Sequence, residues 1–293
     1  MTVRQQEPTS PAGATVAPAG ATNGRADAAA SAPAAPKRRR GTKARRATLS
    51  ILGGLALWEL AIRLFHPSPV QIVGPTSVVS AFVRLAKDGT LGHDFVVSMT
   101  QFALGFLLAA AIAIPLGLLM GTSQRLFDYG DPWLTILYTT PNVALAPLFI
   151  IWLGFGNSSH VAIIALVALF PILINTIDGV RAVEEEWSEV GAAFRANRPE
   201  IFAKIDIPGS LPYIFTGLRL ALARALVGVV VADLFGASAG LGYLLINAAQ
   251  AFKTADVFVA VSVLAALGVF LTGTLRYLQG RLMPWGAPTG GQR

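Results

Sequence analysis

Six long apolar stretches dominate this chain and limit the folds that are open to it. A helix needs about 20 largely apolar residues to cross the hydrocarbon core of a bilayer. Only 13% of the residues are charged and 54% are hydrophobic, whereas a soluble domain carries about 25% charged residues. We therefore expect an all-α polytopic membrane protein with about six transmembrane helices, at residues 48–65, 97–120, 132–153, 160–179, 214–236 and 257–277.

The N-terminal tail differs from the rest of the chain in composition. Residues 1–36 are mostly small residues and proline, and such a segment buries too little apolar surface to offset the entropy of ordering it. The run KRRRGTKARR follows at 37–46, and the basic residues of this tail account for the whole net charge of +7. The charge therefore gives no reason to expect a nucleic-acid partner. The composition predicts a disordered basic tail at 1–46, a membrane domain at 47–286 and a short C-terminal tail at 287–293.

The distribution of lysine and arginine predicts the orientation of the spans. Cytoplasmic connections of membrane proteins carry an excess of these residues. If the N-terminus is inside, the connections on the inner side hold Arg125, Arg181, Arg195, Arg198, Lys204 and Arg281. The connections on the outer side then hold only Arg84, Lys87 and Lys253. We expect both termini in the cytoplasm, and an uncleaved first span because no small-residue cleavage site follows the basic run.

A mixed segment lies between the fourth and fifth spans, on the predicted cytoplasmic side. Residues 189–212 read EVGAAFRANRPEIFAKIDIPGSLP. The apolar positions of 184–203 fall close to helical spacing, and Pro199 suits the first turn of a second helix. The pattern predicts two short helices joined by a turn near 195–198, with Pro208 and Pro212 separating them from the next span. Two interpretations remain open: an amphipathic helix on the lipid surface, or a docking element for a cytoplasmic partner.

This segment resembles the EAA loop of bacterial ABC importer permeases, whose pattern is E-A-A-x3-G-x9-I-x-L-P. Glu189 matches the glutamate, and Ile205 and Pro208 match the end of the motif at the right spacing. The chain departs from the pattern at four positions, which are Val190, Gly191, Arg195 in place of the glycine, and Ile207 in place of the leucine. If the turn at Arg195 needs a positive φ, arginine adopts it at a cost of order 1 kcal/mol.

The resemblance covers about residues 50–286 and extends to other stretches. They are FALGFLLAAAIAIPLGLLMG (102–121), TTPNVALAPLFIIWLGFG (139–156), FPILINTIDGVRAV (170–183), ADLFGASAGLGYLL (232–245) and RLMPW (281–285). Together they resemble the nitrate/sulfonate/taurine-type subfamily. The resemblance assigns contact with an ATPase subunit to Glu189, Gly191, Ala192, Arg195, Ala196, Ile205, Ile207 and Pro208.

The resemblance also implies partners and a solute class. It implies a homodimer in the bacterial inner membrane, ATPase subunits that bind the ATP, and an extracytoplasmic solute-binding protein. This chain is expected to bind no cofactor and to be no enzyme, since it has no cysteine and no phosphate-binding run G-x4-G-K-[S/T]. The implied solute is an aliphatic sulfonate or taurine, with nitrate, cyanate or a thiamine-precursor pyrimidine as alternatives. A membrane scaffold that does not transport is the alternative from another functional class.

Polar and helix-breaking residues inside the spans are candidates for the translocation pathway. Backbone groups freed by a broken helix must line a cavity or find internal partners, which makes Pro141, Asn142 and Pro147 pathway candidates. Charged groups within spans are costly and often functional. Asp233 is therefore a fourth candidate, with capping of the break that follows it as the structural alternative. We expect Glu59 to pair with Arg63 one helical turn away.

Overall fold

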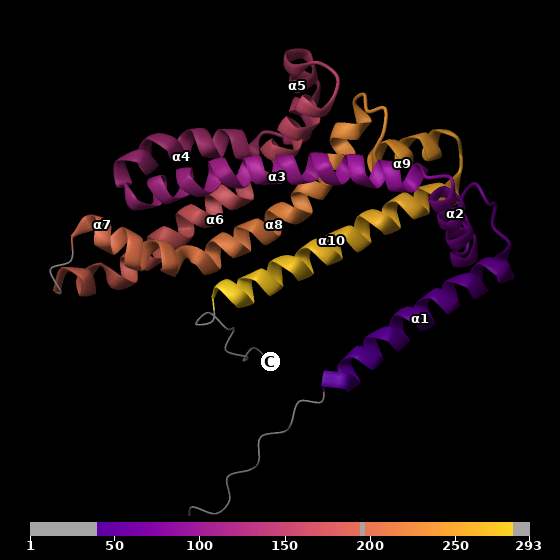
Figure 1. The fold of residues 1–293 in the computed structure, drawn as a ribbon, viewed down its shortest axis with the longest axis horizontal. Coiled ribbons are helices and arrows are strands. Elements are labelled where there is room, and N and C mark those ends of the chain that lie inside the picture. Colours follow the sequence, from indigo (N-terminus) through magenta and orange to yellow (C-terminus); the bar gives the residue numbers. More distant parts are fainter. Residues whose placement is uncertain (1–39, 194–196, 284–293) are drawn as a thin grey trace, which may run out of the picture. The chain divides into compact units, whose positions relative to one another are not determined.

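The structure is a computed structural model that describes residues 40–193 and 197–283. Every regular element in these two ranges is helical. The elements are α1 (Arg40–Phe65), α2 (Pro75–Lys87), α3 (Thr90–Thr122), α4 (Gln124–Thr139), η1 (Asn142–Leu145), α5 (Ala146–Leu153), α6 (Asn157–Ala193), α7 (Arg198–Ile201), η2 (Phe202–Asp206), α8 (Ile207–Leu234), α9 (Leu241–Gln250) and α10 (Thr254–Leu282) (Figure 1).

The chain divides into two compact units, which meet between residues 52 and 53 inside α1. Of the first unit, the structure describes residues 40–52, where Leu49, Ile51 and Leu52 are exposed. Exposed leucine and isoleucine suit a helix that faces lipid. The second unit contains all the elements that form the core and the pockets.

Five helical segments are long and apolar enough to cross a membrane, and a bent pair of helices would make a sixth span. They are 48–65, 90–122, 157–183, 199–234 and 254–282, with the bent pair at 124–153. This confirms the expected all-α polytopic fold and five of the six predicted spans. The predicted boundaries lie within these helices, except that the fifth prediction ends two residues beyond α8.

Helices α3, α6 and α8 pack together as the core of the second unit (Figure 1). Small residues allow their backbones to approach closely: Ala109 and Ala113 on α3 are fully buried. A Cβ atom added to Gly105 would lie 2.7 Å from Ile164 of α6, and one added to Gly117 would lie 2.7 Å from Thr176. Small residues serve the same purpose at helix contacts in membranes generally. The small-residue face of α3 therefore serves helix packing.

The third predicted span, 132–153, is two helices and not one. Helices α4 and α5 meet at an angle of 85° across the short η1 turn. Thr140 takes an extended conformation (φ −65°, ψ 134°), because the ring of Pro141 disfavours the α conformation in the residue before it. Pro147 lies in the first turn of α5, where its missing N–H costs nothing. Of these two prolines, Pro141 therefore causes the break between α4 and α5.

The predicted helix pair between spans four and five also differs from the structure. α6 runs without interruption from Asn157 to Ala193, so the first expected short helix is the end of span four. No proline or internal glycine interrupts 180–190, so the sequence gives the helix no reason to end there. Pro208 and Pro212 do not separate the segment from α8, because Pro208 lies in its first turn and Pro212 inside it.

A hydrogen bond and an ion pair tie α2 to α1 and to α10 within the second unit. Glu59 Oε1 lies 2.9 Å from Arg63 Nε, as predicted. Glu59 also accepts a hydrogen bond from the backbone N–H of Thr76, at 3.2 Å, and so caps the start of α2. Arg84 of α2 pairs with the buried Asp256 of α10. These contacts hold α2 against the start of α10.

Candidate functional site

Two polar regions lie at opposite ends of α6 and α8. The loop end comprises residues 184–193 of α6, then α7, η2 and the first turn of α8. The linker end comprises the first turns of α3 and α6, the start of α9, and residues 235–240, which join α8 to α9. The sequence predicted functional residues at both ends.

The loop end contains the residues that the sequence assigned to partner contact. Glu189, Gly191 and Ala192 lie on the last three turns of α6, whereas Arg195 and Ala196 fall outside the described residues. After this gap, α7 begins with a reciprocal cap. The N–H of Glu200 donates to Asn197 Oδ1 at 3.0 Å, and the N–H of Asn197 donates to Glu200 Oε2 at 3.3 Å. This arrangement is a capping box, with Asn in the usual place of Ser or Thr.

A π-helical turn follows α7 at the loop end. Ile205 lies in this turn, η2, and is half-buried, as are Ile207 and Pro208 at the start of α8. A Cβ atom added to Gly209 would lie 2.7 Å from Val183 of α6, so α6 and α8 converge where the loop end joins the bundle. π-Helical turns are rare and occur frequently at functional sites. No pattern in the sequence predicted this turn.

The break between α4 and α5 lies close to the linker end of α8. Ala146, at the start of α5, is fully buried and packs with Ile163 of α6 and Ala232 of α8. Asn142 Oδ1 is buried and accepts no hydrogen bond from the described residues. Through Ala146, the start of α5 thus lies against the part of α8 that contains Asp233, the neighbour of Ala232. The role of the candidates 141–147 in a pathway stays a prediction.

Asp233 helps to hold the N-terminus of α9. Three side chains accept hydrogen bonds from the backbone N–H groups of three successive residues there. Asp94 Oδ1 accepts from Gly240 at 3.0 Å, Ser98 Oγ from Leu241 at 2.8 Å, and Asp233 Oδ2 from Gly242 at 3.0 Å. All three side chains are buried. They satisfy groups that a helix leaves unpaired at its start.

The geometry of this cap requires glycine. Gly240 has φ +128°, which L-residues rarely adopt, and a Cβ atom there would lie 2.7 Å from Asp233 Oδ2. Asp233 therefore has the structural role of capping the break after α8. Asp94 and Ser98 were not predicted from the sequence. The only available signal was their i,i+4 spacing on α3, which places both on one helix face.

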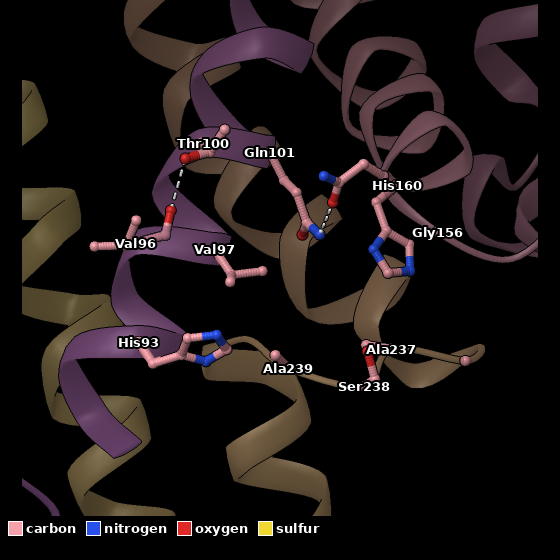
Figure 2. Close-up of a pocket in the computed structure, with 12 residues that line it drawn as sticks. His93, Val96, Val97, Thr100, Gln101, Gly156, His160, Ala237, Ser238 and Ala239 are labelled. Atoms are coloured by element: carbon pink, nitrogen blue, oxygen red, sulfur yellow. Dashed lines mark hydrogen bonds between the residues drawn. The ribbon is translucent and has the colours of Figure 1, made fainter. Parts of the chain in front are cut away.

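A cavity of about 370 Å³ lies beside this cap, between α3, the start of α6 and the α8–α9 linker. We call it the polar pocket. Its polar lining residues are His93, Thr100, Gln101, Asn157, His160 and Ser238. Figure 2 shows His93 and Gln101 extending from α3, His160 from α6, and Ser238 on the linker, around one common space.

Two side chains of the polar pocket are almost completely buried. Gln101 and His160 are each 3% exposed. Gln101 Nε2 donates to Asn157 Oδ1 at 2.9 Å (Figure 2), while Gln101 Oε1 has no partner. His160 Nδ1 lies 3.8 Å from Asp233 Oδ1, beyond hydrogen-bonding distance, and also has no partner. The pocket is therefore lined by polar atoms that the described part of the chain leaves unsatisfied.

The sequence did not predict the polar pocket. His93 and His160 are far apart in the chain, and neither has the spacing of a local motif. Among the described residues, no group of three His, Asp or Glu side chains is placed to hold a metal ion. The pocket can act through hydrogen bonds from amide, imidazole and hydroxyl groups.

Comparison with known proteins identifies the family. The model of the family "Binding-protein-dependent transport system inner membrane component" matches residues 113–284. The chain is 36% identical over 79% of its length to the putative aliphatic sulfonates transport permease protein SsuC of Bacillus subtilis, covering 84% of that protein. It is 31% identical to the formylaminopyrimidine transport permease protein ThiX of Halalkalibacterium halodurans, over 81% of this chain and 94% of ThiX. It is 29% identical to the nitrate import permease protein NrtB of Synechocystis, over 74% of this chain and 80% of NrtB.

The fold is also that of a solved transporter chain. A chain of the MetNI methionine ABC transporter in an inward-facing conformation superposes with a TM-score of 0.52 and 16% sequence identity, over 64% of this chain and 91% of that one. The helical membrane fold, the family match and the extent of the sequence similarity agree. The chain belongs to the binding-protein-dependent transport system inner membrane components and is an ABC importer permease of the sulfonate/taurine/nitrate subfamily.

Proposed function

We propose that this permease carries a small sulfonate, either an aliphatic sulfonate or taurine, across the bacterial inner membrane. The observation that carries the proposal is the 36% identity to a permease named for aliphatic sulfonates. The relatives named for nitrate and for a formylaminopyrimidine are 29% and 31% identical. Nitrate and a thiamine-precursor pyrimidine are therefore the competing solutes in the test below, and cyanate is a further alternative to the sulfonate.

The proposed assembly contains two copies of this chain, two ATPase subunits and an extracytoplasmic solute-binding protein. The family description names a binding protein as a partner of such transport systems. ATP is bound and hydrolysed by the separate ATPase subunits in this proposal, and this chain binds no cofactor. Both termini and the loop end face the cytoplasm, which places the polar pocket on the outer side.

The loop end is the proposed contact with the ATPase. Glu189, Gly191, Ala192, Arg195, Ala196, Ile205, Ile207 and Pro208 form this contact in the proposal. Two features support it. α6 extends ten residues beyond the apolar span 157–183, and the loop end returns through a capped turn and a π-helical turn. A charged, locally built segment suits contact with a soluble protein better than contact with lipid.

The proposed mechanism is alternating access. Closure of the ATPase pair on ATP draws the two loop ends together, and the tightly packed α6 and α8 transmit this movement to the linker end. The close contact at Gly209 and Val183 supports transmission by rigid helices. Hydrolysis and release of phosphate then reset the assembly.

The test is uptake by membrane vesicles that contain the permease, the ATPase that copurifies with it and an excess of the binding protein. Labelled ethanesulfonate, taurine, nitrate and a formylaminopyrimidine are each supplied, with and without ATP. We expect ATP-dependent uptake of ethanesulfonate or taurine and none of the other two. Exclusive uptake of nitrate or the pyrimidine would overturn the solute. An intact assembly that imports none of them would support the scaffold alternative.

A further inference from the structure

We propose that the polar pocket is a binding site for the oxyanion group of the solute, and that Gln101, His160 and Ser238 contact this group directly. The inference rests on the proposed function, because that function supplies the class of solute. It adds where on this chain the solute binds and through which groups. The pocket lies at the linker end, away from the loop end that the proposed function uses for coupling.

The first argument is the unsatisfied chemistry of the pocket. Gln101 and His160 are each 3% exposed, and each has a polar atom without a partner. Burying a polar group without a hydrogen bond is costly, and native proteins do it rarely. A bound solute that hydrogen-bonds to these side chains would offset the cost of their burial. Both side chains line the same cavity (Figure 2), and their unpartnered atoms lie within its wall.

The second argument is the kind of group that lines the pocket. Its described polar lining side chains are two imidazoles, two carboxamides and two hydroxyls. Two carboxylates lie beside the imidazoles but outside the lining: Asp94 Oδ1 is 3.5 Å from His93 Nδ1, and Asp233 Oδ1 is 3.8 Å from His160 Nδ1. The imidazoles of His93 and His160, the amide of Asn157 and the hydroxyl of Ser238 all supply donors. A sulfonate presents three oxygen acceptors, which match several converging donors. Neutral donors also bind an anion less tightly than a fixed cation does, and a transported solute must be released again.

The carboxamide pair can adapt to an anion. Gln101 and Asn157 hydrogen-bond to each other at 2.9 Å. The oxygen and nitrogen of a carboxamide occupy nearly equivalent positions. Reversing both groups therefore keeps this hydrogen bond and replaces the unpartnered Gln101 oxygen by an N–H donor.

The third argument is size and shape. The cavity volume is about 370 Å³, at the lower end of the roughly 300–1,000 Å³ of small-molecule sites. Val96 and Val97 supply apolar surface beside the donors, as the alkyl part of a sulfonate requires. The linker that carries Ser238 is held at its end by the hydrogen bond from the N–H of Gly240 to Asp94 Oδ1.

Ser238 is the best position at which to test the proposal. It is exposed on the linker, and its hydroxyl makes no hydrogen bond within the described residues. Replacing it should leave the fold intact. Ser238→Asp places a negative charge in the pocket and should repel an anion. Ser238→Asn introduces a side chain of the same size as aspartate, but this side chain is neutral and keeps a hydrogen-bond donor. Like charges brought together at a binding site weaken binding by about tenfold or more.

The experiment compares these variants in vesicles that contain the permease, its ATPase and an excess of binding protein, with labelled ethanesulfonate or taurine as the probe. We expect Ser238→Asp to reduce uptake per ATP hydrolysed by about tenfold, while the binding protein still stimulates ATP hydrolysis. We expect Ser238→Asn to lose less uptake than Ser238→Asp, since it introduces a donor and no negative charge. Gln101→Leu should raise the half-saturating solute concentration. Thr274→Ala, on α10 and outside the pocket, is the control.

The outcomes separate the two proposals. If the wild type imports neither probe, the proposed function is wrong. If the wild type imports a probe and Ser238→Asp and Gln101→Leu import it equally well, the pocket does not bind the solute, although the proposed function stands. If Ser238→Asp also loses the stimulation of ATP hydrolysis, the linker end contacts the binding protein and not the oxyanion, and the inference is overturned. If Ser238→Asp accumulates poorly in the membrane, Gln101→Leu decides.

Discussion

The loop end and the linker end are built by different kinds of contact, although the same two helices connect them. At the loop end the hydrogen bonds and the ion pair of Glu200 are local: Asn197 and Glu200 are three residues apart, and Lys204 lies 3.9 Å from Glu200 one turn earlier. At the linker end the contacts join distant parts of the chain. Gly240 and Asp94 are separated by 146 residues, and Gln101 and Asn157 by 56.

This difference indicates how the two ends can work. A segment held by local contacts can move as a unit without breaking the bundle, which suits a contact that must follow a partner. A pocket held by long-range contacts keeps its shape because the core fixes each wall, and such preorganisation suits binding of a small solute. We therefore expect changes at the loop end to affect coupling, and changes at the linker end to affect local stability and solute binding.

The largest expected effect is at the loop end. Glu189→Lys reverses the charge of the one motif glutamate on the α6 extension. If this glutamate contacts the ATPase, the reversed charge repels its partner there, and like charges at an interface cost several kcal/mol, roughly a hundredfold or more in binding. We expect ATP-dependent uptake to be nearly abolished while membrane abundance stays normal. Quantitative blotting of membranes together with vesicle uptake measures both quantities.

Glu184→Lys is the matched control for this prediction. It makes the same charge change on the same helical extension, but five residues away, which is about 140° around the helix. We expect it to retain most of the uptake. Normal uptake by Glu189→Lys at normal abundance would show that the loop end does not couple through this residue, and the contrast between the two ends would fail.

The sequence predicted local features well and long-range features poorly. The apolar spans and the charged loop end each depend on consecutive residues, so length and composition located them. The bend at Pro141 followed from one residue. The polar pocket depends on His93, Gln101, His160 and Ser238 coming together, and no local pattern encodes that juxtaposition. The cap of α9 by Asp94 and Ser98 was missed for the same reason.

Two predictions about where helices end and begin, at the end of α6 and the start of α8, were wrong. The prediction of a separate short helix after span four assumed that charged residues end a membrane helix. Glutamate favours helix, so α6 continues out of the apolar span to Ala193. The prediction that Pro208 and Pro212 separate the segment from the next span overlooked that proline is tolerated in the first turn of a helix, where Pro208 lies. Pro212 lies inside α8 beyond that turn, so this reason does not cover it. α8 begins at Ile207 and contains both prolines.

A smaller effect is expected at the linker end, from Asp233→Ala. This change leaves the N–H of Gly242 without its acceptor in a buried site. An unsatisfied buried donor costs about 1–3 kcal/mol, so we expect a lower unfolding temperature of the purified permease. Hydrogen–deuterium exchange should accelerate at residues 240–243. Asp88→Ala, which removes an exposed carboxylate at the end of α2, is the control and should change neither quantity. Unchanged exchange at 240–243 in Asp233→Ala would mean that Asp94 and Ser98 hold α9 without it.

The smallest expected effect is from Glu200→Ala, which removes one half of the reciprocal cap of α7. Loss of a capping interaction costs about 1 kcal/mol or less at an exposed site, and here the cost falls on a short helix that the core does not hold. We expect faster hydrogen–deuterium exchange at 198–201, an unchanged unfolding temperature, and a loss of uptake smaller than that of Glu189→Lys.

Glu200→Gln separates the cap from the charge, because glutamine can also complete a capping box but cannot form an ion pair with Lys204. If Glu200→Gln retains slow exchange, the cap orders α7. If its exchange at 198–201 is as fast as that of Glu200→Ala, the ion pair with Lys204 at 3.9 Å orders the turn instead. The exchange rate of the wild type should then rise with ionic strength, because salt screens exposed charges.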